Sequence, residues 1–333
     1  MSGAAGTSET RRPPFSAHGL RALFRDRPIV PLLILLALLV VASQIARPGI
    51  VSTDWIGVML RAAVPLAILA GCQTLTMLTG GIDLSVGAVA SMSGFVVATL
   101  VSGPGTPAGI VVAVVVGLIA GLITGIGVGV FRVHPLIMTL GMSLVVLGLA
   151  NVWQLQMVKT NSGVPSQLRW LGSERVAFDI LPVSLLVFVP LTALVLLGLR
   201  RTGYGRLLYA IGDNPIAARL SGARAWQVLV VLYVISAVMA AVAGFLISGL
   251  TNVASVSLAD SYVLPSVAAA VIGGTSIMGG RGGFGGTIVG ALILTVLSSL
   301  LSSLGYPEAV RQVLFGAIIV AVAAAYTRVT GET

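Results

Sequence analysis

The sequence predicts an all-α integral membrane protein with about ten transmembrane helices, some of them broken or re-entrant. Hydrophobic residues make up 57% of the 333 residues and charged residues only 9%, and the mean hydropathy is +1.06. Soluble domains carry about 25% charged residues. Apolar runs of about 18 or more residues, long enough to cross a bilayer core, recur along the chain. The composition therefore excludes soluble globular, disordered and disulfide-rich secreted proteins.

Ten apolar runs account for the expected helices. The polar segment 1–28 precedes the first run, which is too long for the apolar part of a signal peptide and has no clear cleavage site after it. We therefore expect a cytoplasmic tail followed by an uncleaved first helix. The run at 262–278 ends in many glycines and is expected to be broken or re-entrant. The ten expected spans are 29–46, 56–78, 84–101, 108–131, 135–153, 181–199, 226–250, 262–278, 284–304 and 309–326.

The net charge of +9 is interpreted as a signal of membrane orientation. All but one of the 19 basic residues are arginines, and most lie between apolar runs. This distribution sets the orientation of membrane proteins and argues against a nucleic-acid partner. With both termini in the cytoplasm, 13 of the 19 basic residues fall on the cytoplasmic side, which predicts an N-in, C-in topology. Arg61 and Arg311 lie just inside spans and are expected to reach outward to the interface.

The domain organisation follows from the spans. A cytoplasmic tail at 1–28 precedes a transmembrane domain at 29–327, and a short tail at 328–333 follows it. Two segments between spans are long enough to carry function. The segment 154–180 is expected outside the cell, and the segment 200–225 is expected in the cytoplasm.

Two features of the spans are interpreted as packing. Gly117, Gly121 and Gly125 recur every four positions, a spacing that lines one face of a helix and lets a neighbouring helix approach closely. Cys72 is the only cysteine and lies in an apolar run away from both histidines, so it lacks the partners that a metal site or a thiol nucleophile needs.

The segment 78–87 breaks an apolar stretch with two adjacent glycines and an acid, Asp83. Backbone groups freed by such a break are tolerated at membrane depth only inside protein or beside water, and an ionisable group there indicates function. Two interpretations stay open. In the first, Asp83 belongs to a functional site at membrane depth. In the second, it caps the helix that begins at Leu84 by accepting a hydrogen bond from the N–H of Ser85 or Val86.

A second segment holds eight glycines within 14 residues, from Gly273 to Gly286. A phosphate-binding P-loop would end in Gly-Lys-Ser/Thr, but the only lysine is Lys159, which follows a valine. The chain therefore has no Walker A motif and is not itself an ATPase. We expect a tight cytoplasmic turn with close helix contacts, formed by Gly273, Gly274, Gly279, Gly280, Arg281 and Gly282.

A third segment, 209–223, predicts a short helix outside the membrane. Asp213 or Asn214 is suited to cap it with Pro215 at its first position, and Gly222 is suited to stop it. An isolated helix of about two turns is not stable alone, so it must dock on this chain or on a cytoplasmic partner.

Together the three segments resemble the permease subunits of bacterial ABC importers of the ribose/monosaccharide class. The stretch Leu-Thr-Gly-Gly-Ile-Asp-Leu-Ser-Val-Gly is intact at 78–87, and Ile-Gly-Gly-Thr-Ser-x-Met-Gly-Gly-Arg-Gly is matched at 272–282. Pro215, Ile216 and Ala223 depart from the family pattern in the third segment. That segment is otherwise matched by Gly212, Asn214, Ala217, Ala218, Ser221 and Gly222.

This resemblance implies a multi-pass permease domain in the bacterial inner membrane that translocates a monosaccharide or related polyol. The implied partners are a cytoplasmic ABC ATPase, a periplasmic or lipid-anchored sugar-binding protein, a second or sister permease in a dimer, and membrane lipid. The chain itself would bind no cofactor and would catalyse no reaction, since ATP and Mg would be bound by the ATPase. The implied residues of the sugar path are Thr79, Gly80, Gly81, Asp83 and Ser85. The implied ATPase-coupling residues are Gly212, Asp213, Asn214, Ala217, Ala218, Arg219, Ser221 and Gly222.

An ion-coupled secondary transporter is the alternative, because broken helices suit that class too. Such carriers usually hold relays of intramembrane acids, whereas Asp83 is nearly alone in the spans. A membrane enzyme is disfavoured, because no histidine, cysteine or paired acid gathers in the spans. The sequence does not identify the sugar.

Overall fold

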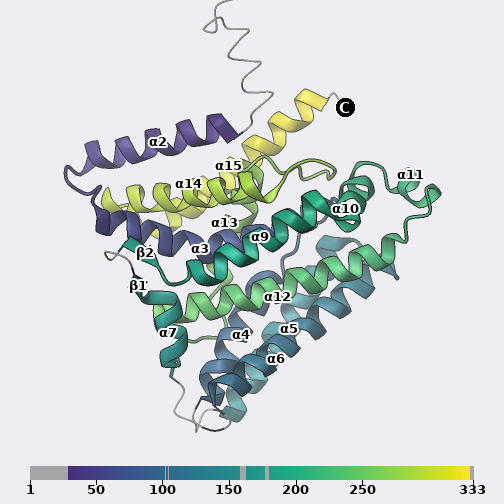
Figure 1. Ribbon diagram of the computed structural model, residues 1–333, viewed down its shortest axis with the longest axis horizontal. Helices are drawn as coiled ribbons and strands as arrows, with labels where there is room; N and C mark the ends of the chain where they lie inside the picture. Colours follow the sequence, from purple (N-terminus) through teal and green to yellow (C-terminus); the bar gives the residue numbers. More distant parts are fainter. Residues whose placement is uncertain (1–28, 102, 104, 158–162, 177–179, 331–333) are drawn as a thin grey trace, which may run out of the picture.

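The computed structural model describes residues 29–101, 103, 105–157, 163–176 and 180–330, and of residues 322–330 the backbone alone. The expectations for the tail at 1–28, for Lys159 and for residues 331–333 therefore lie outside the described residues. The described chain is almost entirely helical (Figure 1).

Each of the ten expected spans overlaps one helix. These helices are α2 (Ile29–Ala46), α3 (Thr53–Met77), α4 (Val86–Leu100), α5 (Thr106–Gly129), α6 (Pro135–Met157), α9 (Leu185–Arg201), α12 (Ala225–Thr251), α13 (Asp260–Ile272), α14 (Phe284–Ser303) and α15 (Glu308–Thr330). The segments between spans add short elements. These are α7 (Ser166–Ser173), β1 (Arg175–Val176), β2 (Leu181–Pro182), α10 (Gly203–Asp213) and α11 (Pro215–Leu220).

Not all ten helices are long enough to cross a bilayer. Within the described part of the chain, six are long and apolar enough, and α9 with α10 makes a seventh if this pair, bent by 69°, counts as one span. Helices α4 and α13 have 15 and 13 residues. At 1.5 Å per residue they rise only about 20 Å, less than the bilayer core of roughly 30 Å. The expected span at 262–278 is indeed broken, because α13 ends at Ile272 before a run of glycines.

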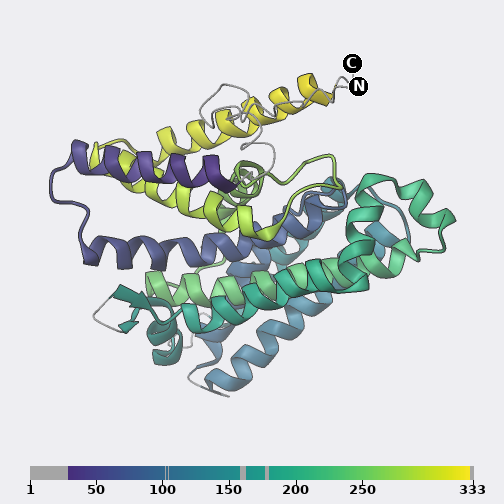
Figure 2. The ribbon, with the colours of Figure 1, turned by 45° about the horizontal axis from the view of Figure 1, so that its top comes forward.

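Helix α3 lies between two groups of helices. On one side α12 packs against α4 and α5, and α6 contacts α4 and α5; on the other side α13 and α14 pack together with α2 and α15 (Figures 1 and 2). Helix α3 contacts α12, α13 and α14. It therefore connects the two groups, and most of its residues from Ala63 onward are buried.

The glycine stripe of α5 packs against α12. A Cβ atom at Gly121 would lie 2.6 Å from the carbonyl oxygen of Tyr233, and one at Gly125 would lie 2.7 Å from the Cα of Val230. The helices approach so closely because these positions carry no side chain, which confirms the packing role expected for the stripe.

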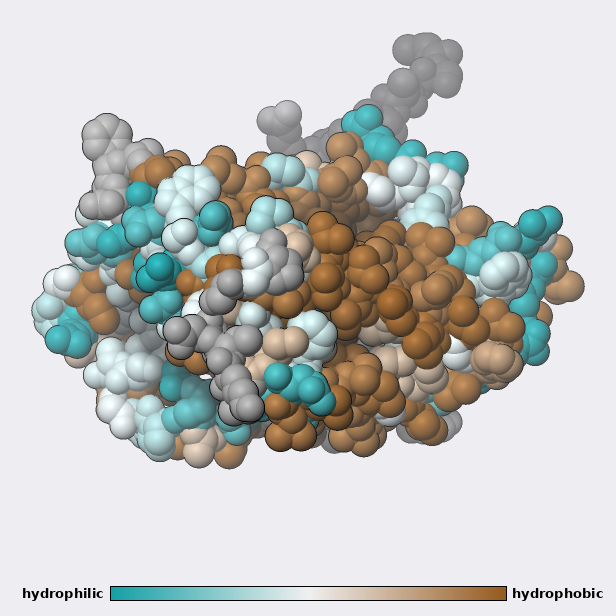
Figure 3. Space-filling model, turned by 90° about the horizontal axis from the view of Figure 1, so that it is seen from below, coloured by the Kyte–Doolittle hydropathy of each residue, from teal (hydrophilic) through white to brown (hydrophobic). Residues whose placement is uncertain are grey.

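The surface fits a bilayer. Figure 3 shows a broad apolar area in the middle of the molecule, with hydrophilic residues gathered toward both ends of the long axis. Large side chains on α5 and α6 are exposed although apolar, among them Val111, Leu144 and Leu155. Exposed apolar side chains in such numbers are expected where lipid replaces water.

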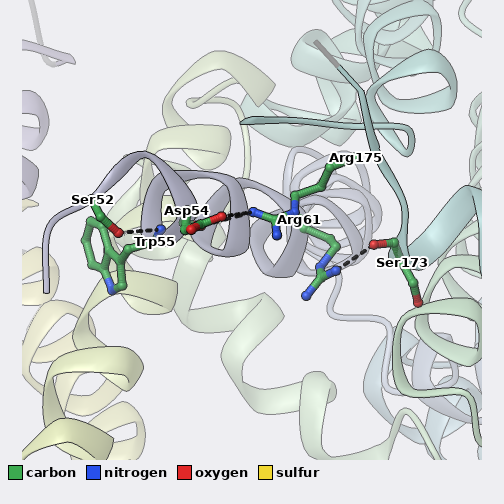
Figure 4. Close-up of polar contacts among 6 residues, drawn as sticks. All are labelled: Ser52, Asp54, Trp55, Arg61, Ser173 and Arg175. Atoms are coloured by element: carbon green, nitrogen blue, oxygen red, sulfur yellow. Dashed lines mark hydrogen bonds and ion pairs between the residues drawn. The ribbon is translucent and has the colours of Figure 1, made fainter. Parts of the chain in front are cut away.

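The polar end near α7 and the β-hairpin is tied to the start of α3 (Figure 4). Strands β1 and β2 pair antiparallel, with Arg175 opposite Pro182. Arg175 forms an ion pair of 3.0 Å with Asp54, and Arg61 donates a hydrogen bond of 2.5 Å from Nη1 to the carbonyl oxygen of Ser173. Arg61 thus points toward the segment that covers this end of the bundle. The expected reach of Arg61 and Arg311 to the membrane interface stays a prediction.

Candidate functional site

The break after α3 begins with a helix C-cap built on glycine. Gly80 has φ +78°, a left-handed conformation that glycine adopts at little cost. The N–H of Gly80 donates to the carbonyl oxygen of Met77 at 2.9 Å, and the N–H of Gly81 donates to that of Thr76 at 3.0 Å. The chain then runs without regular structure until α4 begins at Val86.

Asp83 lies at the centre of this break and is buried among helices. Its Oδ1 accepts hydrogen bonds from the N–H of Ser85 at 3.0 Å and from the Ser85 hydroxyl at 2.6 Å. Its Oδ2 accepts one from the Ser236 hydroxyl of α12 at 2.9 Å. Asp83 is only 2% exposed. It therefore accepts the expected bond from the N–H of Ser85. Helix α4, however, begins at Val86 with Ser85 as its N-cap, so Asp83 precedes the helix instead of capping it and links the break to α12.

The backbone beside Asp83 is held by two further side chains. The amide of Gln73 bonds both ways, donating to the carbonyl oxygen of Asp83 at 2.7 Å and accepting from its N–H at 3.2 Å. The Thr139 hydroxyl of α6 donates to the carbonyl oxygen of Ile82 and accepts from the N–H of Leu84, both at 3.1 Å. Polar backbone groups of the break are thus satisfied by protein, as membrane depth requires.

The sequence analysis did not identify Gln73, Thr139 or Ser236 as members of this site. Their one signal is that each is a polar residue in an apolar run, and all three are fully buried at 0% exposure. Buried polar side chains are normally hydrogen-bonded. A search for polar residues within spans would have found them, although the partner of each depends on how the helices pack.

The glycine segment after α13 forms a tight turn. Gly274, Gly279, Gly280 and Gly282 have φ of +88°, +95°, +70° and +128°, and the N–H of Ser276 donates to the carbonyl oxygen of Arg281 at 3.0 Å. Residues other than glycine rarely adopt these conformations. The turn connects α13 to α14 and closes beside the end of α10, where the Tyr209 hydroxyl donates to the carbonyl oxygen of Gly282 at 2.9 Å.

The three segments singled out in the sequence meet at one point, which we call the glycine junction and define by Leu78, Gly80, Gly212, Gly279 and Gly280. The N–H of Gly280 donates to the carbonyl oxygen of Leu78 at 3.0 Å. Gly212 lies against both groups, so that a Cβ atom there would overlap the Leu78 carbonyl oxygen. A Cβ at Gly279 would lie 2.8 Å from the carbonyl oxygen of Gly212. Backbone thus meets backbone with no side chain between.

Helix α11 follows the junction directly. The Asn214 side chain caps it by accepting from the N–H groups of Ile216 and Ala217 at 3.1 and 3.0 Å. Gly222, with φ +87°, lies just after it. Ala218 is buried against the chain, whereas Ile216 and Leu220 are 64% and 85% exposed. The helix therefore docks on its own chain by one face and presents apolar side chains on the other.

A cavity of about 580 Å³ lies beside the junction, between the α5–α6 turn, α10, α11 and the start of α12. Of the expected path residues, Thr79 lines this cavity, whereas the buried Asp83 and Ser85 do not. Arg219, an expected coupling residue, lines it together with Arg132 and Arg224. The structure thus brings one path residue and one coupling residue to the same cavity.

The hydrogen bond from Ser236 to Asp83 should stabilise the fold. In Ser236→Ala, one carboxylate oxygen loses its partner in a buried place, and we expect unfolding to become easier by about 1–3 kcal/mol. Thermal unfolding in detergent, followed by reaction of the single buried thiol of Cys72 with a maleimide dye, measures the effect. Ser248→Ala is the matched control, because Ser248 is equally buried on α12 but its hydroxyl has no partner. Equal melting of the two variants would contradict the assignment.

Comparison with known proteins places this chain in a family. The model of the branched-chain amino acid transport system / permease component matches residues 56–323. A fructose import permease of Rhizobium meliloti is 31% identical over 300 residues, covering 87% of this chain and 82% of the relative. A ribose import permease of Bacillus subtilis is 35% identical over 285 residues, covering 85% and 88%. A galactofuranose transporter permease of Escherichia coli is 32% identical over 267 residues, covering 79% and 77%.

No solved structure matches the chain. The family match includes all three segments of the glycine junction, from the break after α3 to the turn before α14. With its apolar helices, the chain is a multi-pass protein of the inner membrane, and it belongs to the family of branched-chain amino acid transport system permease components, among relatives that are sugar import permeases.

Proposed function

We propose that the chain is the membrane-spanning permease of an ABC importer and that it translocates a monosaccharide into the cell. The observation that carries this proposal is the glycine junction, where α10, which leads directly into the exposed helix α11, contacts both broken helical segments. A partner that moves α11 would move both breaks together. The relatives are named as import permeases for fructose, ribose and galactofuranose. These names support a monosaccharide or a related polyol as the substrate.

The family membership disfavours the ion-coupled alternative, because the family is described as a permease component of a transport system and one relative, from Escherichia coli, is named a probable ABC transporter permease. The chain would then need no relay of intramembrane acids and no catalytic group. It would need only different contacts in its inward-open and outward-open states, biased by an external source of energy. We propose that this source is ATP, bound with Mg by a separate ATPase chain, and that the permease itself binds no cofactor.

The proposed topology has ten membrane-embedded helices and both termini in the cytoplasm. The end of the molecule that holds the junction carries arginines on and beside α10 and α11, among them Arg201, Arg206, Arg219 and Arg224. Basic residues concentrate on the cytoplasmic side of membrane proteins. The opposite end, with α7 and the β-hairpin, would face the periplasm. The short helices α4 and α13 would enter the membrane without crossing it fully.

We propose three protein partners, two of which would bind at opposite ends of the molecule. Helix α11 would receive the cytoplasmic ATPase through Ile216, Arg219 and Leu220. The α7 and β-hairpin segment, braced by the ion pair between Arg175 and Asp54, would receive a periplasmic or lipid-anchored sugar-binding protein. A second or sister permease would complete a dimeric channel, with membrane lipid around it.

We further propose that the break at Thr79, Gly80, Gly81, Asp83 and Ser85 lines or controls the sugar path. Thr79 and Gly80 are its accessible members, since Gly80 is exposed and Thr79 lines the cavity beside the junction. Asp83 and Ser85 would act by fixing the shape of the break through their hydrogen bonds to each other and to α12. Hydroxyl and backbone groups suit an uncharged, hydroxyl-rich solute.

Replacing path residues should slow transport. Gly81→Leu would place a side chain against the Tyr233 hydroxyl and Pro135, since even a Cβ there lies 3.0 Å from that oxygen. Asp83→Asn would remove the charge that three donors share. We expect both variants to lower the initial rate of uptake of D-ribose or D-fructose into vesicles that hold the assembled importer. Wild-type rates in both variants would disprove a role for the break.

Helix α11 should be required for ATPase binding. In Arg219→Glu and Leu220→Ser, the exposed face loses its cation or its most exposed apolar side chain, which is 85% exposed. We expect either change to abolish co-purification of the ATPase while the permease stays folded. Arg206→Glu is the matched control, because Arg206 is an exposed arginine of α10. Loss of binding in Arg206→Glu as well would show that α11 is not the specific contact, and normal co-purification of Arg219→Glu and Leu220→Ser would contradict the prediction.

Gly212 should be required for coupling. In Gly212→Ala, the new Cβ would force α10 away from the Leu78 carbonyl oxygen. We expect the variant to bind the ATPase but to hydrolyse ATP without sugar uptake. Gly203→Ala, at the start of the same helix, is the control, because a Cβ there meets only the flexible end of Arg206, at 3.7 Å. Normal uptake per ATP in Gly212→Ala would show that the junction does not transmit movement.

A further inference from the structure

A second cavity lies at the end of α3 that is remote from the break. It has a volume of about 460 Å³, within the range of small-molecule sites. Helices α3, α13, α14 and α15 surround it. Its polar side chains are Ser261, Tyr262, Thr295, Ser298, Ser299, Ser302, Glu308 and Arg311.

Four of these hydroxyls form one stripe on α14. Thr295, Ser298, Ser299 and Ser302 follow the spacing of one helix face. They reach about 10 Å into the bundle, since seven residues of helix rise by 1.5 Å each. Most other residues of α14 are apolar or glycine. Small polar residues in membrane helices usually serve close helix packing, but all four residues of this stripe line a cavity.

Several of the cavity hydroxyls are free to bind a ligand. Thr295 donates to a carbonyl oxygen of its own helix at 2.8 Å, which leaves its oxygen atom as an acceptor. The side-chain hydroxyls of Ser261, Tyr262 and Ser298 make no hydrogen bond to any other described residue, and all three residues line the cavity. The cavity therefore offers both donors and acceptors that the fold does not use.

The mouth of the cavity is held in place by charged and aromatic side chains. Glu308 and Arg311 form an ion pair, and Arg311 Nη1 donates to the Ser302 hydroxyl at 3.0 Å. The Trp55 indole N–H donates to the Ser299 hydroxyl at 3.2 Å. Because the one acid and the one base of the cavity pair with each other, the site has no net charge and suits a neutral ligand.

The remaining wall is apolar. Leu66, Pro265 and Phe315 line it together with the ring of Tyr262. A sugar ring presents hydroxyls around its edge and C–H groups on its faces, so it matches a site with hydroxyls on one side and apolar and aromatic groups on the other. A charged amino acid or an apolar solute would leave one of the two sides unmatched.

We propose that this cavity is a monosaccharide subsite at the outer mouth of the transport path, which rests on the proposed function of the chain as a sugar permease. The helices α3, α13 and α14 that line the cavity also run to the two breaks at the glycine junction. A shift of these helices at the junction changes the spacing of the hydroxyls at their other ends. The subsite thereby takes up sugar in one state of the transporter and releases it in the other.

Cysteine protection tests the subsite on the assembled importer in vesicles. The native Cys72 is fully buried, so a charged methanethiosulfonate reagent added outside reports only an introduced thiol. Ser298→Cys places that thiol in the cavity. Ser303→Cys is the matched control, because Ser303 lies on the same helix but does not line the cavity. The probes are D-ribose, D-fructose, D-galactose and D-xylose, with glycine betaine as a control solute.

We expect the transported sugar to slow modification of Ser298→Cys about threefold at twice its Kd, by simple occupancy, and to leave Ser303→Cys unchanged. Fast modification of Ser298→Cys that no sugar slows, in an importer that still accumulates sugar, would overturn the subsite alone. A Ser298→Cys thiol that never reacts would also overturn it. An importer that accumulates none of the four sugars would instead overturn the proposed function.

Discussion

The fold depends on satisfying one buried break in a helix. Where α3 ends, the backbone leaves regular structure among apolar helices, and its buried polar groups need partners within the protein. Asp83, Gln73 and Thr139 fill that need from within, and Ser236 ties the carboxylate to α12. The same bonds fix the register between α3, α4, α6 and α12. Losing one of them leaves a buried polar group unpaired, which costs more than the bond itself contributes.

The glycine junction gives a physical meaning to three sequence motifs that are far apart along the chain. Leu78 and Gly212 are 134 residues apart in sequence and Gly212 and Gly280 are 68 apart, yet all three touch through backbone atoms. Glycine is needed at Gly212 and Gly279 because a side chain at either position would push the facing backbone segments apart. The arrangement joins α10 to both broken segments through short, stiff backbone contacts, which suits transmission of movement better than flexible side chains would.

Much of the fold could be predicted from the sequence, because long apolar runs and caps are local signals. The ten helices, the cap at Asn214 and the stop at Gly222 follow from such signals. The shortness of α4 and α13 was harder to predict, because residues such as Ile277 are apolar without being helical. The partners of Asp83 and the hydroxyl cavity depend on which sides of the helices pack against each other. No single segment of the sequence carries that information.

The contact at Gly212 also limits how the chain can change over time. When two side chains meet, a larger residue on one side is often accommodated by a smaller one on the other. At Gly212 the opposing atoms are the carbonyl oxygen of Leu78 and the N–H of Gly280, which every residue carries. No substitution of the facing residues can make room for a Cβ there. A lineage that loses this glycine can recover only by moving whole helices, so reversion is the simplest repair.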